Sequence, residues 1–359
     1  MTLSPVFRSQ SAVDLLTEEG IWAQLEPAIL GQASAVTRLN EDLRDLVDAR
    51  FLGPSPSVPD QSSVRSPECL PFLQEYFFLI LFRSLFESLG VEERRLELYS
   101  ELDFCIKGTI TAADNLFDDQ AKSLLPLEVS SGSRFLSILQ LMCFERLIRR
   151  VLDRRVEGQE LEPADREAVL RGLLDRMAAI GALEGSEEEG VADVPPPDEM
   201  VEAVHRVRGG ALFTLAFVAP GRLEQGEVAE RLFRAEPAVA RLGTAFQVVD
   251  DLTDFEFDLG RGSHNLLVSQ IEHRGTNDER RALERLRQGG DPGEDPVRQL
   301  FAESARQVLE RAYVEARGSF ADLGALGFWF PPSLSEQVVH AIVGLDGTAR
   351  MEGLAATGR

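Results

Sequence analysis

The sequence has little cysteine, no long apolar run and no leader-like N-terminus. Its three cysteines lie far apart, without a Cys-x-x-Cys spacing, which argues against a disulfide framework or a zinc knuckle and is typical of a reducing compartment. The longest unbroken apolar run, residues 77–82, is too short to cross a bilayer. The first ten residues, MTLSPVFRSQ, show no signal-peptide pattern. These absences predict a cytoplasmic protein without stable membrane insertion.

Positive charge is also scarce. Asp and Glu number 60 against 37 Lys and Arg, which gives a formal net charge of -23. A surface this acidic repels phosphate backbones and anionic membranes, so the composition argues against nucleic acid as a partner. An anionic substrate would need local neutralisation, for example by a metal ion. The two lysines, Lys107 and Lys122, both flank the first acidic motif described below.

Apolar residues recur with the helical period, and no run alternates convincingly with the period of a strand. We therefore predict an all-α fold. The segment 75–89 is apolar nearly all round, which indicates a buried central helix. Helices are expected at 11–49, 70–89, 92–120, 133–156, 163–183, 198–219, 224–256, 278–288, 296–322 and 333–344.

Three breaks rich in proline and glycine separate these helices, at 53–67, 185–197 and 289–296. The middle break is also the most acidic, and we predict that it is a solvated loop. Its acidic residues include Glu187, Glu188, Glu189 and Asp193.

The first acidic motif is DNLFDD, residues 114–119, within an otherwise apolar helical pattern. Asp114 and Asp118 are four residues apart, so both carboxylates project from one face of a helix. Like charges at this spacing destabilise an isolated helix by roughly 0.2–0.5 kcal/mol per pair. A bound cation would offset that cost, whereas the alternative interpretation is a solvated acidic face.

The second acidic motif repeats this arrangement with more carboxylates. Asp250, Asp254 and Asp258 are spaced at i, i+4 and i+8, Asp251 follows Asp250, and Gln247 lies one turn earlier. Carboxylate oxygens suit a hard divalent cation, and Mg²⁺ is commonly held by one or two carboxylates together with substrate phosphates. Two such stripes within apolar helices favour a metal site over two accidental acidic faces.

The segment AFQVVDDLTDF, residues 245–255, resembles the second aspartate-rich motif of the trans-polyprenyl diphosphate synthases. Upstream, RGGALF at 208–213 resembles their basic-Thr-Gly-Ala-Leu-Phe segment. Residues 114–118 take the place of the first DDxxD, with Asn115 in place of its second aspartate. Order and separation match the class I isoprenoid synthase superfamily over about residues 70–270.

This resemblance implies an isoprenoid synthase-type bundle of antiparallel helices around a central cavity. The chain would form one helical domain over 1–359, with a divergent N-terminal segment at 1–66, a catalytic core at 67–270 and C-terminal helices at 271–359. The resemblance further implies Mg²⁺ as cofactor, an allylic prenyl diphosphate as substrate, and a homodimer.

The resemblance also assigns roles to single residues. The expected metal ligands are Asp114, Asp118, Asp250, Asp251, Asp254 and Asp258. Of these, the residues expected to carry catalysis are Asp114, Asp118, Asp250 and Asp254. The residues expected to contact the substrate are Arg208, Gln247, Lys122 and Arg261.

Departures from the family pattern leave the reaction open. The Gly-Lys-Arg segment that binds a second diphosphate substrate in elongating enzymes has no counterpart before residue 70, and the Arg-Arg-Gly after the first motif is absent. A second diphosphate site needs several cations, so the sequence favours ionisation followed by cyclisation or rearrangement, as in terpene synthases. The alternatives are a divergent trans-prenyltransferase, a non-catalytic regulatory subunit, and a helical scaffold with accidental acidic faces.

Overall fold

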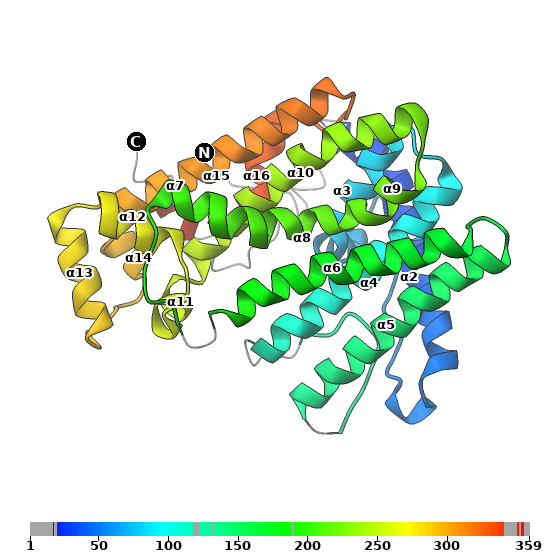
Figure 1. Ribbon diagram of the computed structural model, residues 1–359, viewed down its shortest axis with the longest axis horizontal. Helices are drawn as coiled ribbons and strands as arrows, with labels where there is room; N and C mark the ends of the chain where they lie inside the picture. Colours follow the sequence, from blue (N-terminus) through cyan, green and yellow to red (C-terminus); the bar gives the residue numbers. More distant parts are fainter. Residues whose placement is uncertain are drawn as a thin grey trace. The chain divides into compact units, whose positions relative to one another are not determined.

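The computed structural model is helical throughout its two compact units (Figure 1). The N-terminal unit comprises Pro5–Leu173 and Leu215–Leu232, and the C-terminal unit comprises Leu174–Thr214 and Phe233–Arg359, in each case as far as the structure describes them. The described residues are 17, 20–117, 122–130, 132–187, 190–340, 350–351 and 353–354.

The N-terminal unit is built on four long helices and the first part of a fifth. Helix α4 packs against α5, α2 and α3. As predicted, α3 is buried nearly all round. The helices are α2 (Ile21–Leu46), α3 (Leu70–Ser88), α4 (Glu93–Phe117), α5 (Ser133–Glu157) and α6 (Pro163–Gly185), followed later in the chain by η4 (Leu215–Phe217) and α9 (Val218–Leu223).

A glycine sets the close packing of α4, the helix that carries the first acidic motif. A Cβ atom added to Gly108 would lie only 2.0 Å from Cζ of Phe144 on α5. Phe144 is fully buried and meets Phe104 edge to face, with 6.0 Å between ring centroids. A larger side chain at Gly108 would push α5 away, so this glycine allows α4 to pack closely against α5.

The C-terminal unit contains the second acidic motif and most of the shorter helices. In Figure 1, α15 (orange) is long and packs against α12, α14 and α16. The elements are α7 (Pro197–Met200), the π-helix η3 (Val201–Gly210), α8 (Ala211–Thr214), α10 (Gly226–Thr253, from Phe233 onward), α11 (Phe255–Arg261), α12 (Leu266–Arg274), α13 (Asn277–Arg287), α14 (Pro296–Gln299), α15 (Ala302–Ala325) and α16 (Ser335–His340).

The all-α prediction is confirmed, while several helix boundaries differ from the expected ones. The described residues contain no β-strand, only an isolated bridge between Leu52 and Leu127. The single helix expected at 198–219 is divided into five short elements, and α12 was not predicted. In the described part of the chain, no helix has the length and apolarity needed to span a membrane.

Candidate active site

Two glycines bring η3 and α10 into backbone contact at the second acidic motif. A Cβ atom on Gly209 would lie 2.3 Å from the carbonyl oxygen of Gly243, and one on Gly243 would lie 2.2 Å from that of Gly209. No larger residue fits at either position without moving one of the helices. Gly209 of RGGALF and Gly243 therefore place η3 directly beside the helix that carries Asp250 and Asp251.

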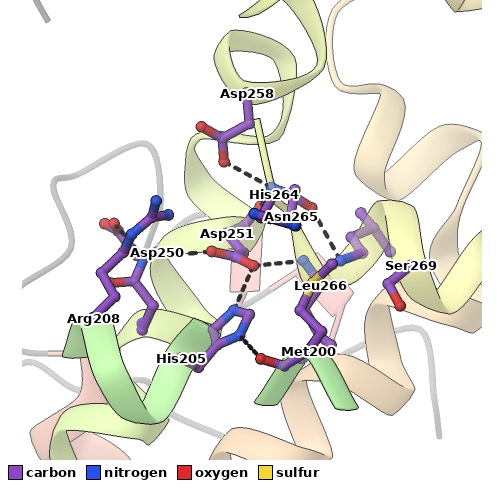
Figure 2. Close-up of polar contacts among 12 residues, drawn as sticks. Met200, His205, Arg208, Asp250, Asp251, Asp258, His264, Asn265, Leu266 and Ser269 are labelled. Carbon is purple, nitrogen blue, oxygen red and sulfur yellow. Dashed lines mark hydrogen bonds and ion pairs between the residues drawn. The ribbon is translucent and has the colours of Figure 1, made fainter. Parts of the chain in front are cut away.

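Asp251 is turned into the protein and surrounded by hydrogen-bond donors (Figure 2). Its side chain is 2% exposed. Oδ2 accepts a hydrogen bond from the backbone N–H of Leu266 at 2.5 Å and lies 2.7 Å from Nε2 of His205. The other ring nitrogen of His205 lies 3.2 Å from the carbonyl oxygen of Met200. Asp251 thus joins α10, η3 and the start of α12.

Asn265 connects the same network to Asp258. Its side-chain amide donates to the carbonyl oxygen of Asp251 at 2.7 Å and to Oδ2 of Asp258 at 2.9 Å. Its Oδ1 caps α12 by accepting from the backbone N–H groups of Leu267 and Val268. Burial, and next the nearby Asp251 carboxylate, raise the pKa of Asp258 to about 8. Asp258 therefore faces the same interior network as Asp251.

Asp250 and Asp254 lie on the more open side of the motif. Asp250 is half-buried and Asp254 is exposed. The N–H of Asp254 donates to the carbonyl oxygen of Asp250 at 2.9 Å, so the helical turn continues between them although Asp254 itself separates α10 from α11. Gln247 is buried, and its amide makes long contacts of 3.4 Å with both Asp250 and Asp251.

Arg208 and His264 both meet the carboxylate of Glu187. Nη2 of Arg208 lies 2.9 Å from Oε1 of Glu187, and Nδ1 of His264 lies 2.6 Å from the same oxygen. The N–H of His264 also donates to Oε2 at 3.1 Å. Although burial acts in the opposite direction, these hydrogen bonds and the charge of Arg208 hold the pKa of Glu187 below its ordinary value.

The position of Glu187 corrects one prediction. The break at 185–197 was expected to be a solvated loop, yet Glu187 is only 3% exposed, whereas Asp193 is exposed. The reason is pairing with cationic or donor groups distant in sequence, which local composition does not reveal. Glu188 and Glu189 lie outside the described residues.

The first acidic motif lies at the end of α4 in the N-terminal unit. Asp114 is exposed, and Asp118 lies outside the described residues. Asn115 is 2% exposed and binds the backbone of Lys122 through both ends of its amide. Its Nδ2 donates to the Lys122 carbonyl oxygen at 2.7 Å, and its Oδ1 accepts from the Lys122 N–H at 3.1 Å. Nε2 of Gln140 donates to the same carbonyl at 3.1 Å.

The two remaining candidate substrate contacts differ in their surroundings. The side chain of Lys122 is exposed while its backbone is held by Asn115 and Gln140. The guanidinium of Arg261 lies over the ring of Phe257, 5.2 Å from its centroid. The Lys122 side chain is therefore open to solvent, whereas Arg261 is half-buried against Phe257.

The carboxylates predicted to bind a metal ion differ in how accessible they are. Among the described residues, no group of three or more His, Cys, Asp or Glu side chains is arranged to hold a metal ion. Asp250 and Asp254 provide a pair of accessible carboxylates, whereas Asp251 and Asp258 are engaged in the interior. Asn265 could have been recognised as an N-cap preceding the apolar run LLVSQI, but no local signal marks Glu187 or the pairing of His205.

The fold of the chain is shared with solved prenyl diphosphate synthases. A decaprenyl diphosphate synthase from Rhodobacter capsulatus is 17% identical, with a TM-score of 0.56 over 93% of this chain and 99% of that one. A geranylgeranyl pyrophosphate synthetase from Pyrococcus horikoshii is 13% identical, with a TM-score of 0.55 over 90% and 99%. For a geranylgeranyl pyrophosphate synthase from Lactobacillus brevis the values are 14%, 0.52, 90% and 95%.

This chain has the class I isoprenoid synthase fold. At these identities the likeness establishes the fold, and it confirms the expected resemblance and architecture. No family model matches the sequence. No curated protein matches it either. The isoprenoid synthase fold covers nine-tenths of the chain, well beyond residues 70–270, over which the motifs alone suggested it.

Proposed function

We propose that this chain is a Mg²⁺-dependent class I isoprenoid synthase that ionises an allylic prenyl diphosphate and joins the resulting cation to a second isoprenoid substrate. The observation that carries the proposal is the fold, which the chain shares over about nine-tenths of its length with polyprenyl and geranylgeranyl diphosphate synthases. These neighbours favour chain extension over the cyclisation that the sequence motifs alone favoured.

The carboxylates of the second motif suit Mg²⁺. Asp250 and Asp254 are one helical turn apart, and both reach solvent to some degree. Mg²⁺ takes one or two protein carboxylates and completes its coordination with water and substrate phosphates. When bound, Mg²⁺ would neutralise the departing diphosphate as a Lewis acid. We propose that Asp114 and Asp118 of the first motif also serve as Mg²⁺ ligands.

Asp251 and Asp258 have a different role in this proposal. Their carboxylates accept hydrogen bonds from Leu266 and Asn265 inside the C-terminal unit. Such bonds fix the helix turn on which Asp250 lies, so we assign Asp251 and Asp258 to support of the metal-binding carboxylates. Gln247 lies between Asp250 and Asp251 and would steady both.

A second candidate is cyclisation of a single prenyl diphosphate. The observation in its favour is the pairing of Arg208 with two glutamates, because a cation already neutralised in this way contributes less to a second diphosphate site. A regulatory subunit that lacks activity is the third candidate, and it predicts no turnover of any prenyl diphosphate.

Incubation with allylic prenyl diphosphates and Mg²⁺, with and without isopentenyl diphosphate, separates these candidates. A longer diphosphate product is the expected result. A hydrocarbon or alcohol formed without isopentenyl diphosphate would contradict prenyl transfer and support cyclisation. Absence of pyrophosphate release from every substrate would contradict both enzyme candidates. Asp193→Asn, which changes an exposed aspartate of the same unit, is the matched control for substitutions at Asp250.

A further inference from the structure

We propose that Arg208 and His264 form an anion site for diphosphate, and that the carboxylate of Glu187 occupies this site until a diphosphate group displaces it. The inference rests on the proposed function and adds a form of regulation to it. Arg208 belongs to η3 and His264 to the segment between α11 and α12, so two separate parts of the C-terminal unit converge on one carboxylate.

The donors around Glu187 are those that commonly bind phosphate. They comprise a guanidinium group, a ring nitrogen of histidine and the backbone N–H of His264. Arginine presents its donors in a planar fork that matches phosphate as well as carboxylate oxygens. A diphosphate has more oxygens and more negative charge than one carboxylate, so it can engage the same donors more completely.

Arg208 is incompletely satisfied by its present partners. Its Nε lies 2.5 Å from Oε1 of Glu184, yet the angle is too poor for a hydrogen bond. Among the described residues, this buried nitrogen has no hydrogen-bond partner. The Nε atom is thus paired with Glu184 by charge, without a well-aligned hydrogen bond. A diphosphate that replaces Glu187 at Nη2 could also offer Nε a better aligned oxygen.

The proposed anion site adjoins the second acidic motif within the same unit. Burial lowers the pKa of Arg208, but the charges of Glu184, Glu187 and Asp251 together raise it above its ordinary value. His205, on the same η3 element, contacts Asp251 directly. A diphosphate held by Arg208 and His264 would therefore lie near Asp251, the residue that directly follows the Mg²⁺-assigned Asp250.

Backbone hydrogen bonds hold the chain at Glu187 and after it. The N–H of Glu187 donates to the Glu184 carbonyl oxygen at 3.1 Å, the N–H of Gly190 donates to the Glu187 carbonyl oxygen at 2.9 Å, and the N–H of Val191 donates to the carbonyl oxygen of Gly262 at 2.8 Å. These bonds do not involve the Glu187 carboxylate. The side chain can therefore exchange its partners without loss of the backbone contacts that hold this segment.

Binding of inorganic pyrophosphate in the presence of Mg²⁺, measured by calorimetry on the full chain, tests this inference. Glu187→Gln removes the competing charge, and we expect it to tighten pyrophosphate binding on the order of tenfold, because charge-assisted contacts are about twice as strong as neutral ones. Glu202→Gln is the control, since Glu202 is an exposed glutamate on the same η3 element and its loss changes the net charge equally. We expect no change for this variant.

Unchanged or weaker binding by Glu187→Gln would overturn the inference, because a purely structural ion pair predicts one of these results. If wild type and Glu187→Gln bind equally, the proposed function stands and only the displacement fails. If neither binds pyrophosphate, both fail. Should Glu187→Gln not fold, as judged by circular dichroism, Glu187→Asp keeps the charge but shortens its reach. A gain in affinity for that variant supports displacement, and no gain overturns it.

Discussion

The two acidic motifs place their second residue in the same way. Asn115 and Asp251 each follow the first aspartate of their motif, and each is 2% exposed. Each also holds a later part of the chain, because Asn115 binds the backbone of Lys122 and Asp251 accepts from the N–H of Leu266. The preceding aspartates are more accessible in both motifs.

The motifs differ in the chemistry that these buried residues meet. Asn115 faces one carbonyl oxygen and one N–H of Lys122, so it needs both a donor and an acceptor. Asp251 faces a backbone N–H, the ring of His205 and the amide of Gln247. An amide suits the first setting and a carboxylate the second. The identity of the second residue thus matches its interior partners in each motif.

The largest effect is expected from Asp250→Asn, which changes the accessible carboxylate beside Asp251. We expect kcat/KM to fall about a thousandfold, because metal neutralisation of the leaving group contributes several kcal/mol to the reaction. The free energy of unfolding should change by less than about 0.5 kcal/mol. Pyrophosphate release and urea unfolding measure the two quantities. Activity retained at the wild-type level would show that Asp250 is not the functional carboxylate beside Asp251.

Asp251→Asn should have the opposite profile. It removes a buried carboxylate from its hydrogen-bond donors, so we expect a loss of about 3 kcal/mol in the free energy of unfolding. Urea denaturation measures this loss. Asp254→Asn, at an exposed position in the same motif, is the control and should leave stability unchanged. A fully stable Asp251→Asn variant would show that Asp251 does not join the elements around it.

Asn115→Asp restores the family's acidic residue and sharpens the comparison in the first motif. A carboxylate cannot donate to the Lys122 carbonyl oxygen, so we expect stability to fall by about 2 kcal/mol. Binding of pyrophosphate with Mg²⁺ should not improve. Asp114→Asn exchanges an exposed neighbour and serves as the control for stability. Tighter binding with unchanged stability would mean that Asn115 is a lost metal ligand after all.

Asp103 lies on the same helix as Asn115, and burial is the main influence on the pKa of its carboxyl group. It is 5% exposed, and burial raises its pKa well above the usual range. The folded protein keeps this proton to a higher pH than the unfolded chain, so its contribution to stability is present at low pH and is lost as the pH rises above 3.8 toward the folded pKa.

Asp103→Asn should remove this pH dependence and stabilise the protein at pH 8 by on the order of 1 kcal/mol. Urea unfolding of wild type and variant at pH 5 and about pH 8 checks the prediction. Asp45→Asn, at an exposed position of the same unit, is the control. Equal destabilisation of Asp103→Asn at both pH values would indicate that its carboxyl is ionised and paired.

The predicted helices show which parts of the fold follow from the local sequence pattern. The buried helix at 70–89 appears as α3, and the helix before the first motif appears as α4. Both follow from apolar spacing alone. The helix expected at 198–219 is instead divided around the π-helix η3, where Gly209 meets Gly243. That contact joins residues 34 positions apart, so no local window contains it.

The sequence by itself determined the all-α class, the acidic stripes and their likeness to prenyl diphosphate synthases, because periodicity and motif spacing are local properties. Only the tertiary structure decided which side chains face inward. Asp250 and Asp251 are neighbours, but successive residues of a helix point about 100° apart. Asp250 therefore remains accessible while Asp251 contacts His205. In the same way, Glu187 is buried because it pairs with Arg208. In both cases, partners distant in sequence decide which charged side chains are buried.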